Sequence, residues 1–285
     1  MNPASRDIQA ISPSRLFTLL GWTRHSYYLL SGFLLALFLL GYIWWPLAKE
    51  YLSYIDWQGS WWLYLDWLLL GIFLLMSLLI MAGADLQVDV RIIMVGLIGG
   101  LVIESWGTQT NLWHYYTAER PPVWIIPAWP IASISIDRLV RFLQKTIPRG
   151  DRVFKITYWL VFPVFYALML SFVRPTLDKS LTLCALGLVT FLILTPTDHR
   201  IAVLTFVAGS GLGYFLERWG TTRECWTYYT FQAPPLLAVL AHGMAAVAFW
   251  RSLRSLIALV VMMNLVFSKF KMSRRRNPND GLTGD

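Results

Sequence analysis

The sequence predicts an all-α polytopic membrane protein with about eight transmembrane helices, arranged as two parallel four-helix repeats. The 285 residues are 56% hydrophobic and only 14% charged, whereas soluble domains carry about 25% charged residues. The apolar residues form long uninterrupted blocks, as in chains that cross a membrane several times. In addition, the phrase ESWGTQTNLWHYYTAERPP at 104–122 returns as ERWGTTRECWTYYTFQAPP at 217–235.

Eight apolar blocks are long enough to be read as spans, since a crossing helix needs about 20 residues. They are Tyr27–Trp45, Trp61–Ala82, Val90–Trp106, Pro122–Phe142, Val153–Val173, Leu177–Leu194, Ile201–Trp219 and Pro234–Leu253. A ninth apolar stretch, Leu256–Phe267, follows Arg251 and Arg254 without a turn signal. We interpret it as an extension of the last helix or an interfacial segment, and the sequence leaves open whether it spans.

The positive charges predict the orientation in the membrane. With eight spans, most of the basic residues fall on one side: Arg6, Arg15, Arg24, Arg138, Arg141, Lys145, Arg149, Arg152, Lys155, Lys269, Lys271 and Arg274–Arg276. The positive-inside rule then places both termini in the cytoplasm, and we expect the cell inner membrane. This distribution also argues against nucleic acid as the partner of a chain with net charge +8.

The expected organisation has four parts. A cytoplasmic tail at 1–26, with an interfacial helix around Ser14–Trp22, precedes a first four-helix repeat at 27–145. A second repeat follows at 146–255, and residues 256–285 form the apolar extension and a basic cytoplasmic tail.

The two copies of the phrase align without a gap when they are shifted by 113 positions (104 to 217). Identical pairs include Glu104/Glu217, Trp106/Trp219, Gly107/Gly220, Trp113/Trp226, Tyr115/Tyr228, Tyr116/Tyr229 and Pro122/Pro235; Arg138/Arg251 and Arg141/Arg254 match as well. So many identical residues in an alignment without gaps indicate a duplicated unit. An even number of spans separates the copies, so the halves share one orientation. We therefore expect Glu104 and Glu217 to approach each other at the outer mouth of the bundle.

Two buried carboxylic acids among aromatic rings suit one chemistry well. An acid can protonate a C=C bond, and aromatic faces stabilise the resulting cation. The sequence therefore predicts a hydratase (lyase) or cyclase (isomerase) for an isoprenoid polyene, with Glu104 and Glu217 as catalytic residues. The expected substrate-binding residues are Trp106, Trp113, His114, Tyr115, Tyr116, Trp129, Trp219, Trp226, Tyr228, Tyr229 and His242.

Three alternatives remain open from the residues alone. Each glutamate can anchor its own loop by accepting hydrogen bonds from Trp, Thr or backbone donors. The chain can also be a lipid- or pigment-binding subunit of a membrane complex, a homo-oligomer, or a small-molecule transporter. A metal site made by Glu104, His114, Glu217 and His242 is disfavoured, because neither histidine is part of the repeat. We therefore expect no metal and no cofactor.

One stretch resembles a known family. The segments GGLVIESWGTQT, WHYYT and PPVWIIPAWPIA, with Gly100, Glu104, Gly107, Tyr115–Tyr116 and Pro127–Trp129, are similar to the integral-membrane carotenoid biosynthesis proteins, which include bisanhydrobacterioruberin hydratases. The resemblance implies a multi-span protein that adds water to the ends of a long polyene without an organic cofactor.

The surroundings of the two glutamates differ in sequence. Arg218 follows Glu217 directly, whereas Ser105 follows Glu104. A nearby cation favours an ionised carboxylate. The sequence therefore predicts that Arg218 pairs with Glu217 and that Glu104 is the proton donor.

Overall fold

The computed structural model describes residues 21–196 and 198–276, with the backbone alone at 266 and 268–276. The chain is about 78% helical. Six helices are long and apolar enough to cross a membrane: Arg24–Ile43, Leu86–Gln109, Val123–Thr146, Asp151–Thr176, His199–Thr222 and Leu236–Leu265. The predicted class, an all-α membrane protein, is therefore confirmed. The interfacial helix expected at Ser14–Trp22 lies almost wholly outside the described residues, as does the end of the tail at 277–285.

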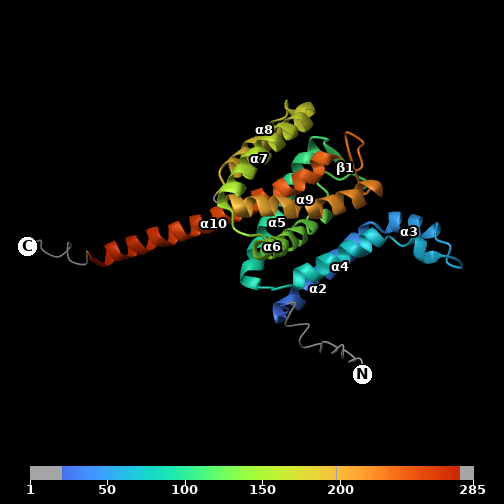
Figure 1. Ribbon diagram of the computed structural model, residues 1–285, viewed down its shortest axis with the longest axis horizontal. Helices are drawn as coiled ribbons and strands as arrows, with labels where there is room; N and C mark the ends of the chain where they lie inside the picture. Colours follow the sequence, from blue (N-terminus) through green and yellow to red (C-terminus); the bar gives the residue numbers. More distant parts are fainter. Residues whose placement is uncertain (1–20, 197, 277–285) are drawn as a thin grey trace, which may run out of the picture.

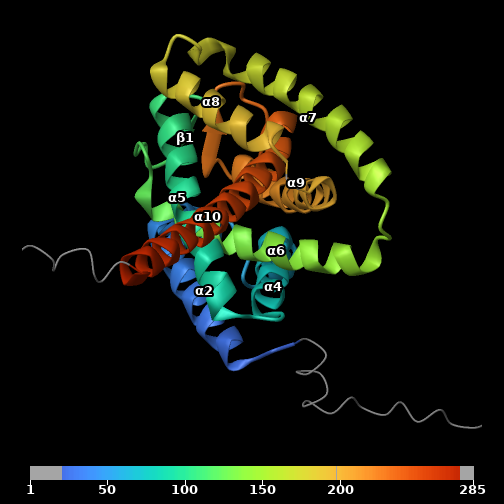
Figure 2. The same ribbon diagram turned by 90° about the vertical axis from the view of Figure 1, so that its left-hand side faces the viewer.

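Four helices pack against one another in the middle of the molecule. They are α5 (Leu86–Gln109), α6 (Ala128–Thr146), α9 (His199–Thr222) and α10 (Leu236–Arg276). Two helical hairpins flank them, as Figures 1 and 2 show: α2 (Arg24–Ile43) with α4 (Trp67–Met81) on one side, and α7 (Asp151–Val173) with α8 (Ser180–Leu194) on the other. The α4 helix contacts α6 and α9, whereas α8 contacts α10 and α5.

Glycines allow the central helices to approach closely. A Cβ atom added at Gly96 of α5 would lie 2.8 Å from the Cα of Pro130 in α6. A Cβ atom added at Gly209 of α9 would lie 2.8 Å from the Cα of Gly243 in α10. The α5–α6 and α9–α10 pairs therefore meet backbone to backbone, as small residues permit in membrane bundles.

Two of the predicted spans are shorter helices than the apolar blocks suggested. The block Trp61–Ala82 divides into a 3₁₀ turn, η1 (Trp61–Tyr64), and the 15-residue helix α4. Its start is fixed by the Asp66 side chain, which accepts a hydrogen bond from the backbone N–H of Leu69 at 3.1 Å. The block Leu177–Leu194 likewise gives the 15-residue helix α8 after the turn η3 (Arg174–Thr176).

Helix α5 is longer than the predicted span Val90–Trp106, because polar residues before it are folded into the helix. Asp85 caps it by accepting from the N–H of Gln87 at 3.0 Å. One turn later, the fully buried Asp89 accepts a hydrogen bond from Arg138 of α6 at 2.7 Å. An acid that reads as loop in the sequence is thus neutralised inside the helix pair.

Some of the segments between these helices contain further small elements. Helix α3 (Trp45–Ser53), which the sequence did not predict, follows α2 and carries Pro46 in its first turn. The strand β1 (Trp113–Tyr115) and the turn η2 (Val123–Ile125) connect α5 to α6. The strand β2 (Trp226–Tyr228) connects α9 to α10.

The last helix, α10, is one continuous element of 41 residues. It joins the predicted span Pro234–Leu253 to the apolar stretch Leu256–Phe267, so this stretch is a helical extension. At 1.5 Å per residue the helix is about 62 Å long, and it projects well beyond the other helices (Figure 1). Its apolar residues past the bundle are exposed, including Val261 at 53% and Phe267 at 67%.

Candidate functional site

The two copies of the repeated phrase lie side by side in a short antiparallel ribbon. Strand β1 follows α5 and strand β2 follows α9; their pairs are Trp113 with Tyr228, His114 with Thr227, and Tyr115 with Trp226. The ribbon therefore holds the C-terminal ends of α5 and α9 together at one end of the molecule.

The turn from helix to strand has the same backbone in both copies. The N–H of Leu112 donates to the carbonyl of Gly107 at 2.9 Å, and the N–H of Cys225 donates to the carbonyl of Gly220 at 2.9 Å. Asn111 and Glu224 occupy the left-handed region, with φ of 63° and 55°. These turns reverse the chain, so that the first and third strand residues point back at the helix that precedes them.

Glu104, on the last turns of α5, is 3% exposed and accepts three side-chain hydrogen bonds. Its Oε2 accepts from the indole N–H of Trp113 at 3.0 Å. Its Oε1 accepts from the hydroxyl of Tyr115 at 2.9 Å and from the indole N–H of Trp129 at 3.1 Å. Both oxygens are therefore engaged by donors from β1 and α6.

Glu217, on α9, is 2% exposed and has a matching environment. Its Oε2 accepts from the indole N–H of Trp226 at 3.0 Å, and its Oε1 accepts from the hydroxyl of Tyr228 at 2.8 Å. The third partner differs, because the Nε2 of His242 lies 2.8 Å from Oε1 at the position that Trp129 occupies in the first copy. The two clusters are thus alike except that an imidazole replaces an indole.

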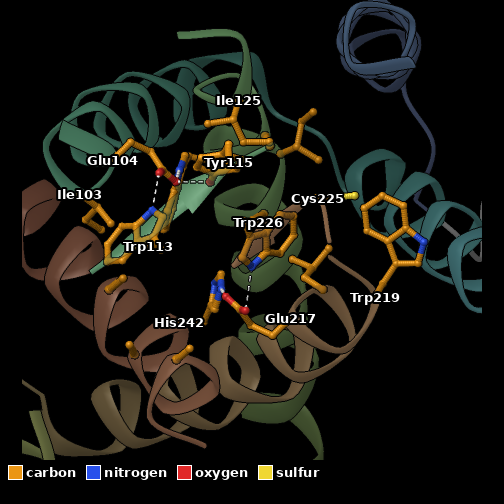
Figure 3. Close-up of a pocket in the computed structure, with 18 of the residues that line it drawn as sticks. Ile103, Glu104, Trp113, Tyr115, Ile125, Glu217, Trp219, Cys225, Trp226 and His242 are labelled. Carbon is orange, nitrogen blue, oxygen red and sulfur yellow. Dashed lines mark hydrogen bonds and ion pairs between the residues drawn. The ribbon is translucent and has the colours of Figure 1, made fainter. Parts of the chain in front are cut away.

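The partners of one glutamate pack against the partners of the other. Trp113 contacts Tyr228 with ring centroids 5.9 Å apart, and Tyr115 contacts Trp226 at 6.0 Å. The indole of Trp129 stacks on the imidazole of His242 at 5.8 Å, with 17° between the ring planes. The six side chains form one aromatic layer between the carboxylates, and Figure 3 shows Trp113 directed at Glu104 and Trp226 directed at Glu217.

Burial also decides the protonation of the two phenols in this layer. Burial, followed by the negative charge of Glu104, raises the pKa of Tyr115 well above its ordinary value. Burial and Glu217 raise the pKa of Tyr228 in the same way. Both hydroxyls therefore stay protonated at any physiological pH and act as donors toward the glutamates.

A cavity of about 1060 Å³ adjoins this layer and extends along the bundle. Its wall includes both glutamates and His242, and most of the remainder is apolar. The apolar residues come from the central helices and from both flanking hairpins, among them Phe33, Leu37, Ile72, Met76, Phe165, Met169, Val189 and Phe249. A cavity of this kind suits an elongated apolar ligand that carries few polar groups.

The structure gathers most of the predicted site residues on this cavity. Its wall contains Glu104, Trp106, Trp113, Tyr115, Trp129, Glu217, Trp219, Trp226, Tyr228 and His242. Trp106 and Trp219 are directed toward the flanking hairpins: their indole N–H groups donate to Thr182 Oγ1 at 3.1 Å and to Asp66 Oδ2 at 2.8 Å.

Three predicted substrate-binding residues do not line the cavity. His114 is exposed, because alternate residues of a strand face opposite sides and its neighbours Trp113 and Tyr115 face Glu104. Tyr116 and Tyr229 follow the strands and tie them to the flanking helices: their hydroxyls donate to the carbonyls of Ile43 and Phe172. These tyrosines position the loops.

The predicted pairing of Arg218 with Glu217 is wrong. Arg218 is exposed, and its Nη1 donates to the carbonyl of Ala233 at 3.2 Å. Adjacent helical residues point about 100° apart, so a residue next to an inward-facing glutamate turns toward the surface. Glu217 instead meets the imidazole of His242, 25 residues away in sequence.

Within the described residues, no three His, Cys, Asp or Glu side chains come together as they would around a metal ion. His114 and His242 lie on different surfaces, one exposed on β1 and the other on the cavity wall. The four residues weighed as a mixed metal site are therefore not assembled into one.

Sequence reasoning missed two groups of residues. The first is the hairpin contacts of Asp66 and Thr182, which depend on tertiary packing. The second is the buried pair of Asp89 and Arg138. The available signal for this pair was an acidic residue, Asp89, directly before an apolar block.

Comparison of the chain with known protein families, with curated proteins and with solved structures finds no match. None of these comparisons tests the resemblance to carotenoid hydratases, which stays a prediction from the sequence.

Proposed function

We propose that the chain crosses the membrane eight times, with the shorter helices α4 and α8 as two of the crossings and with both termini in the cytoplasm of a cell inner membrane. The proposal is supported by matching lengths 113 positions apart: α4 and α8 have 15 residues each, and α5 and α9 have 24 residues each. In this arrangement the halves are parallel repeats, and the ribbon of β1 and β2 lies at the outer face.

The function that the geometry supports best is acid-assisted chemistry on an elongated isoprenoid lipid, either hydration or cyclisation of a polyene. The observation that carries it is the position of two buried carboxylate clusters on the wall of one large apolar cavity. Buried ionisable groups inside a membrane bundle are costly and usually functional. An apolar ligand is also the kind that reaches such a cavity from the bilayer.

The proposed reaction conserves atoms and charge. The cluster gives a proton to one carbon of a C=C bond, whose π electrons form the new C–H bond. The cation on the other carbon faces the indoles and phenols, which stabilise positive charge through their ring faces. In hydration, water bonds to this carbon and returns a proton to the cluster; in cyclisation, an internal C=C bond attacks and a neighbouring C–H bond loses the proton.

A second candidate function has its own supporting observation. Both oxygens of Glu104 are engaged by three donors, which is what an anchor for the β1 loop requires. If Glu217 acts in the same way, the cavity belongs to a lipid- or pigment-binding subunit of a membrane complex, or to a transporter.

One experiment separates these functions. The protein is purified in mild detergent, its bound lipids are identified by mass spectrometry, and it is incubated with polyenes in H₂¹⁸O. We expect a bound isoprenoid and a product that carries ¹⁸O or an additional ring. A bound polyene that survives incubation unchanged supports the binding subunit, and an empty protein that releases no lipid contradicts both. Glu119→Gln, an exposed glutamate near β1, is the control for general effects of removing a carboxylate.

A further inference from the structure

We propose that His242 and Glu217 form the proton-donating pair of the site, and that Glu104 serves as the hydrogen-bond acceptor that holds the β1 loop. This inference rests on the proposed acid chemistry and assigns its two carboxylates different roles. It reverses the sequence-based expectation that Glu104 gives the proton.

The partners of Glu104 include two indoles that cannot relay a proton. Trp113 and Trp129 contact it through indole N–H groups, which donate hydrogen bonds and cannot accept them. Tyr115 supplies the third donor, at 2.9 Å. A proton on Oε1 would displace one of its two donors, and a proton on Oε2 would find no acceptor in the indole of Trp113, so these partners relay no proton to or from Glu104.

The second cluster differs at the one position where it matters for proton transfer. An imidazole can hold a proton on Nε2, share it with a carboxylate and regain it, since its unperturbed pKa lies near neutrality. The Nε2 of His242 and the Oε1 of Glu217 are 2.8 Å apart, within the range of a strong charge-assisted hydrogen bond. No indole at this position could do the same.

Exposure indicates which side of the pair meets a ligand. The side chain of His242 is 22% exposed, whereas that of Glu217 is 3% exposed, and both lie on the cavity wall. His242 thus presents the pair to the cavity, while Glu217 orients it from behind. The stacked indole of Trp129 provides a π face for the imidazolium.

The groups around the pair are consistent with a single shared proton. Besides its two members, the titratable side chains around the pair are Tyr228, which donates to Glu217, and Glu104 and Tyr115, which lie beyond the stacked indole of Trp129. Within the described residues, no lysine or arginine makes a hydrogen bond to either glutamate. The imidazole of His242 is therefore the basic group in contact with Glu217.

In the proposed step, the proton shared by His242 Nε2 and Glu217 Oε1 moves to one alkene carbon. The C=C π pair becomes the new C–H bond, and positive charge develops on the other carbon. Water then bonds to that carbon and its released proton returns to the pair, so the pair is unchanged after one hydration. In cyclisation the returning proton comes from the carbon next to the final cation.

The first test replaces each member of the pair and, for comparison, Glu104. His242→Gln keeps a donor toward Glu217 but cannot carry the proton, and we expect it to lower product formation at least 100-fold, within the usual range of about 10²–10⁴ for loss of a general acid. Glu217→Gln should have the same effect. Glu104→Gln keeps an amide oxygen for the donors of β1 and α6 and should lower product formation less than the two variants of the pair do, whereas Glu119→Gln, at an exposed position, should leave it unchanged.

The decisive variant is the double exchange Trp129→His with His242→Trp, which moves the imidazole beside Glu104. If the histidine–glutamate pair is the proton source, the double variant recovers at least tenfold over His242→Trp alone. Loss of activity in Glu104→Gln together with full activity in His242→Gln would overturn the proposal.

A second readout does not depend on the reaction. Nitrogen NMR of ¹⁵N-histidine-labelled protein follows the imidazole of His242, identified by the signal that His242→Gln removes. We expect Glu217→Gln to change this signal more than Glu104→Gln does, because Glu217 is in hydrogen-bond contact with the ring. If no polyene is converted but the signal behaves in this way, the pair exists and the proposed function is wrong. If Glu217→Gln leaves the titration of the His242 imidazole unchanged, His242 and Glu217 do not act as a pair.

Discussion

The two halves of the molecule are alike around their glutamates and differ at two places. In the first half, Glu104 meets an indole at position 129 and the far end of α5 is held by the buried pair of Asp89 and Arg138. In the second half, Glu217 meets the imidazole of His242, and Ala202 occupies the position that corresponds to Asp89. The comparison teaches that the copies share a carboxylate and its strand donors, and differ in the third partner and in the buried pair at the far end of the helix.

The largest expected difference between the halves concerns their arginines. Arg138→Met leaves the fully buried Asp89 without its cation, and removing one partner of a buried pair costs about 3–5 kcal/mol. Arg251→Met, at the equivalent position, removes hydrogen bonds to the Thr195 carbonyl and to Ser255 and should cost about 1.5 kcal/mol. The free energy of unfolding in detergent, followed by circular dichroism, measures both.

The control for this comparison is Asp89→Leu combined with Arg138→Met. Replacing the whole pair by apolar side chains should recover most of the loss, because no unpaired charge stays buried. Equal destabilisation by Arg138→Met and Arg251→Met would show that the halves are stabilised alike at this end.

The next effect should be the same in both halves. Trp113→Phe and Trp226→Phe each remove an indole N–H that lies 3.0 Å from a buried carboxylate oxygen. Hydrogen bonds to charged groups contribute about 1.5–3 kcal/mol, and the two losses should agree within about 0.5 kcal/mol. Thermal unfolding of both variants provides the measurement. A clearly larger cost on one side would mean that the glutamates are not equivalent even in their shared contacts.

A smaller effect should separate stability from activity. A Cβ atom at Gly100 would lie 2.4 Å from the Trp129 ring, and one at Gly213 would lie 2.4 Å from the Cβ of His242. Overpacking of this kind costs about 1–3 kcal/mol. We expect Gly100→Ala to lower stability with little change in activity per folded molecule, and Gly213→Ala to reduce activity at least tenfold by displacing the imidazole. Similar activities for the two variants would argue against different roles for the halves.

The mildest test concerns a thiol that replaces an aliphatic side chain. Cys225, 3% exposed, corresponds in position to Leu112, 1% exposed. Burial raises the pKa of the Cys225 thiol to about 12. Because the thiolate is the reactive form, its fraction at pH 8 is small in the folded protein. In a Cys184→Ser background, maleimide labelling at pH 8 should be on the order of 10³ slower than after unfolding in SDS; comparable rates would show that this loop opens readily.

The sequence predicted much of this arrangement, because the apolar blocks and the repeated phrase are visible without a structure. The membrane class follows from the apolar blocks, and the approach of the two phrases was predicted from their duplication. Ten of the predicted site residues line the cavity, since the two aromatic residues that lie two positions apart in each strand contact the glutamate of their own half.

The sequence could not predict which way individual side chains point, or which residues far apart in the chain contact one another. A neighbour in sequence such as Arg218 turns away from Glu217 on a helix, whereas His242 reaches it from α10. The strand conformation that turns His114 outward lasts only three residues, too short for a recognisable alternation. Asp89 reads as the edge of a loop until Arg138 is placed beside it.

The length of α10 has a mechanical consequence. His242 lies near one end of this helix, and the stretch at 256–267 lies on the same rod outside the bundle. Within the described residues, no proline interrupts the helix between them. A tilt of the exposed stretch would therefore move the backbone of His242 with it, because about 20–40 Å of unbroken helix joins the two.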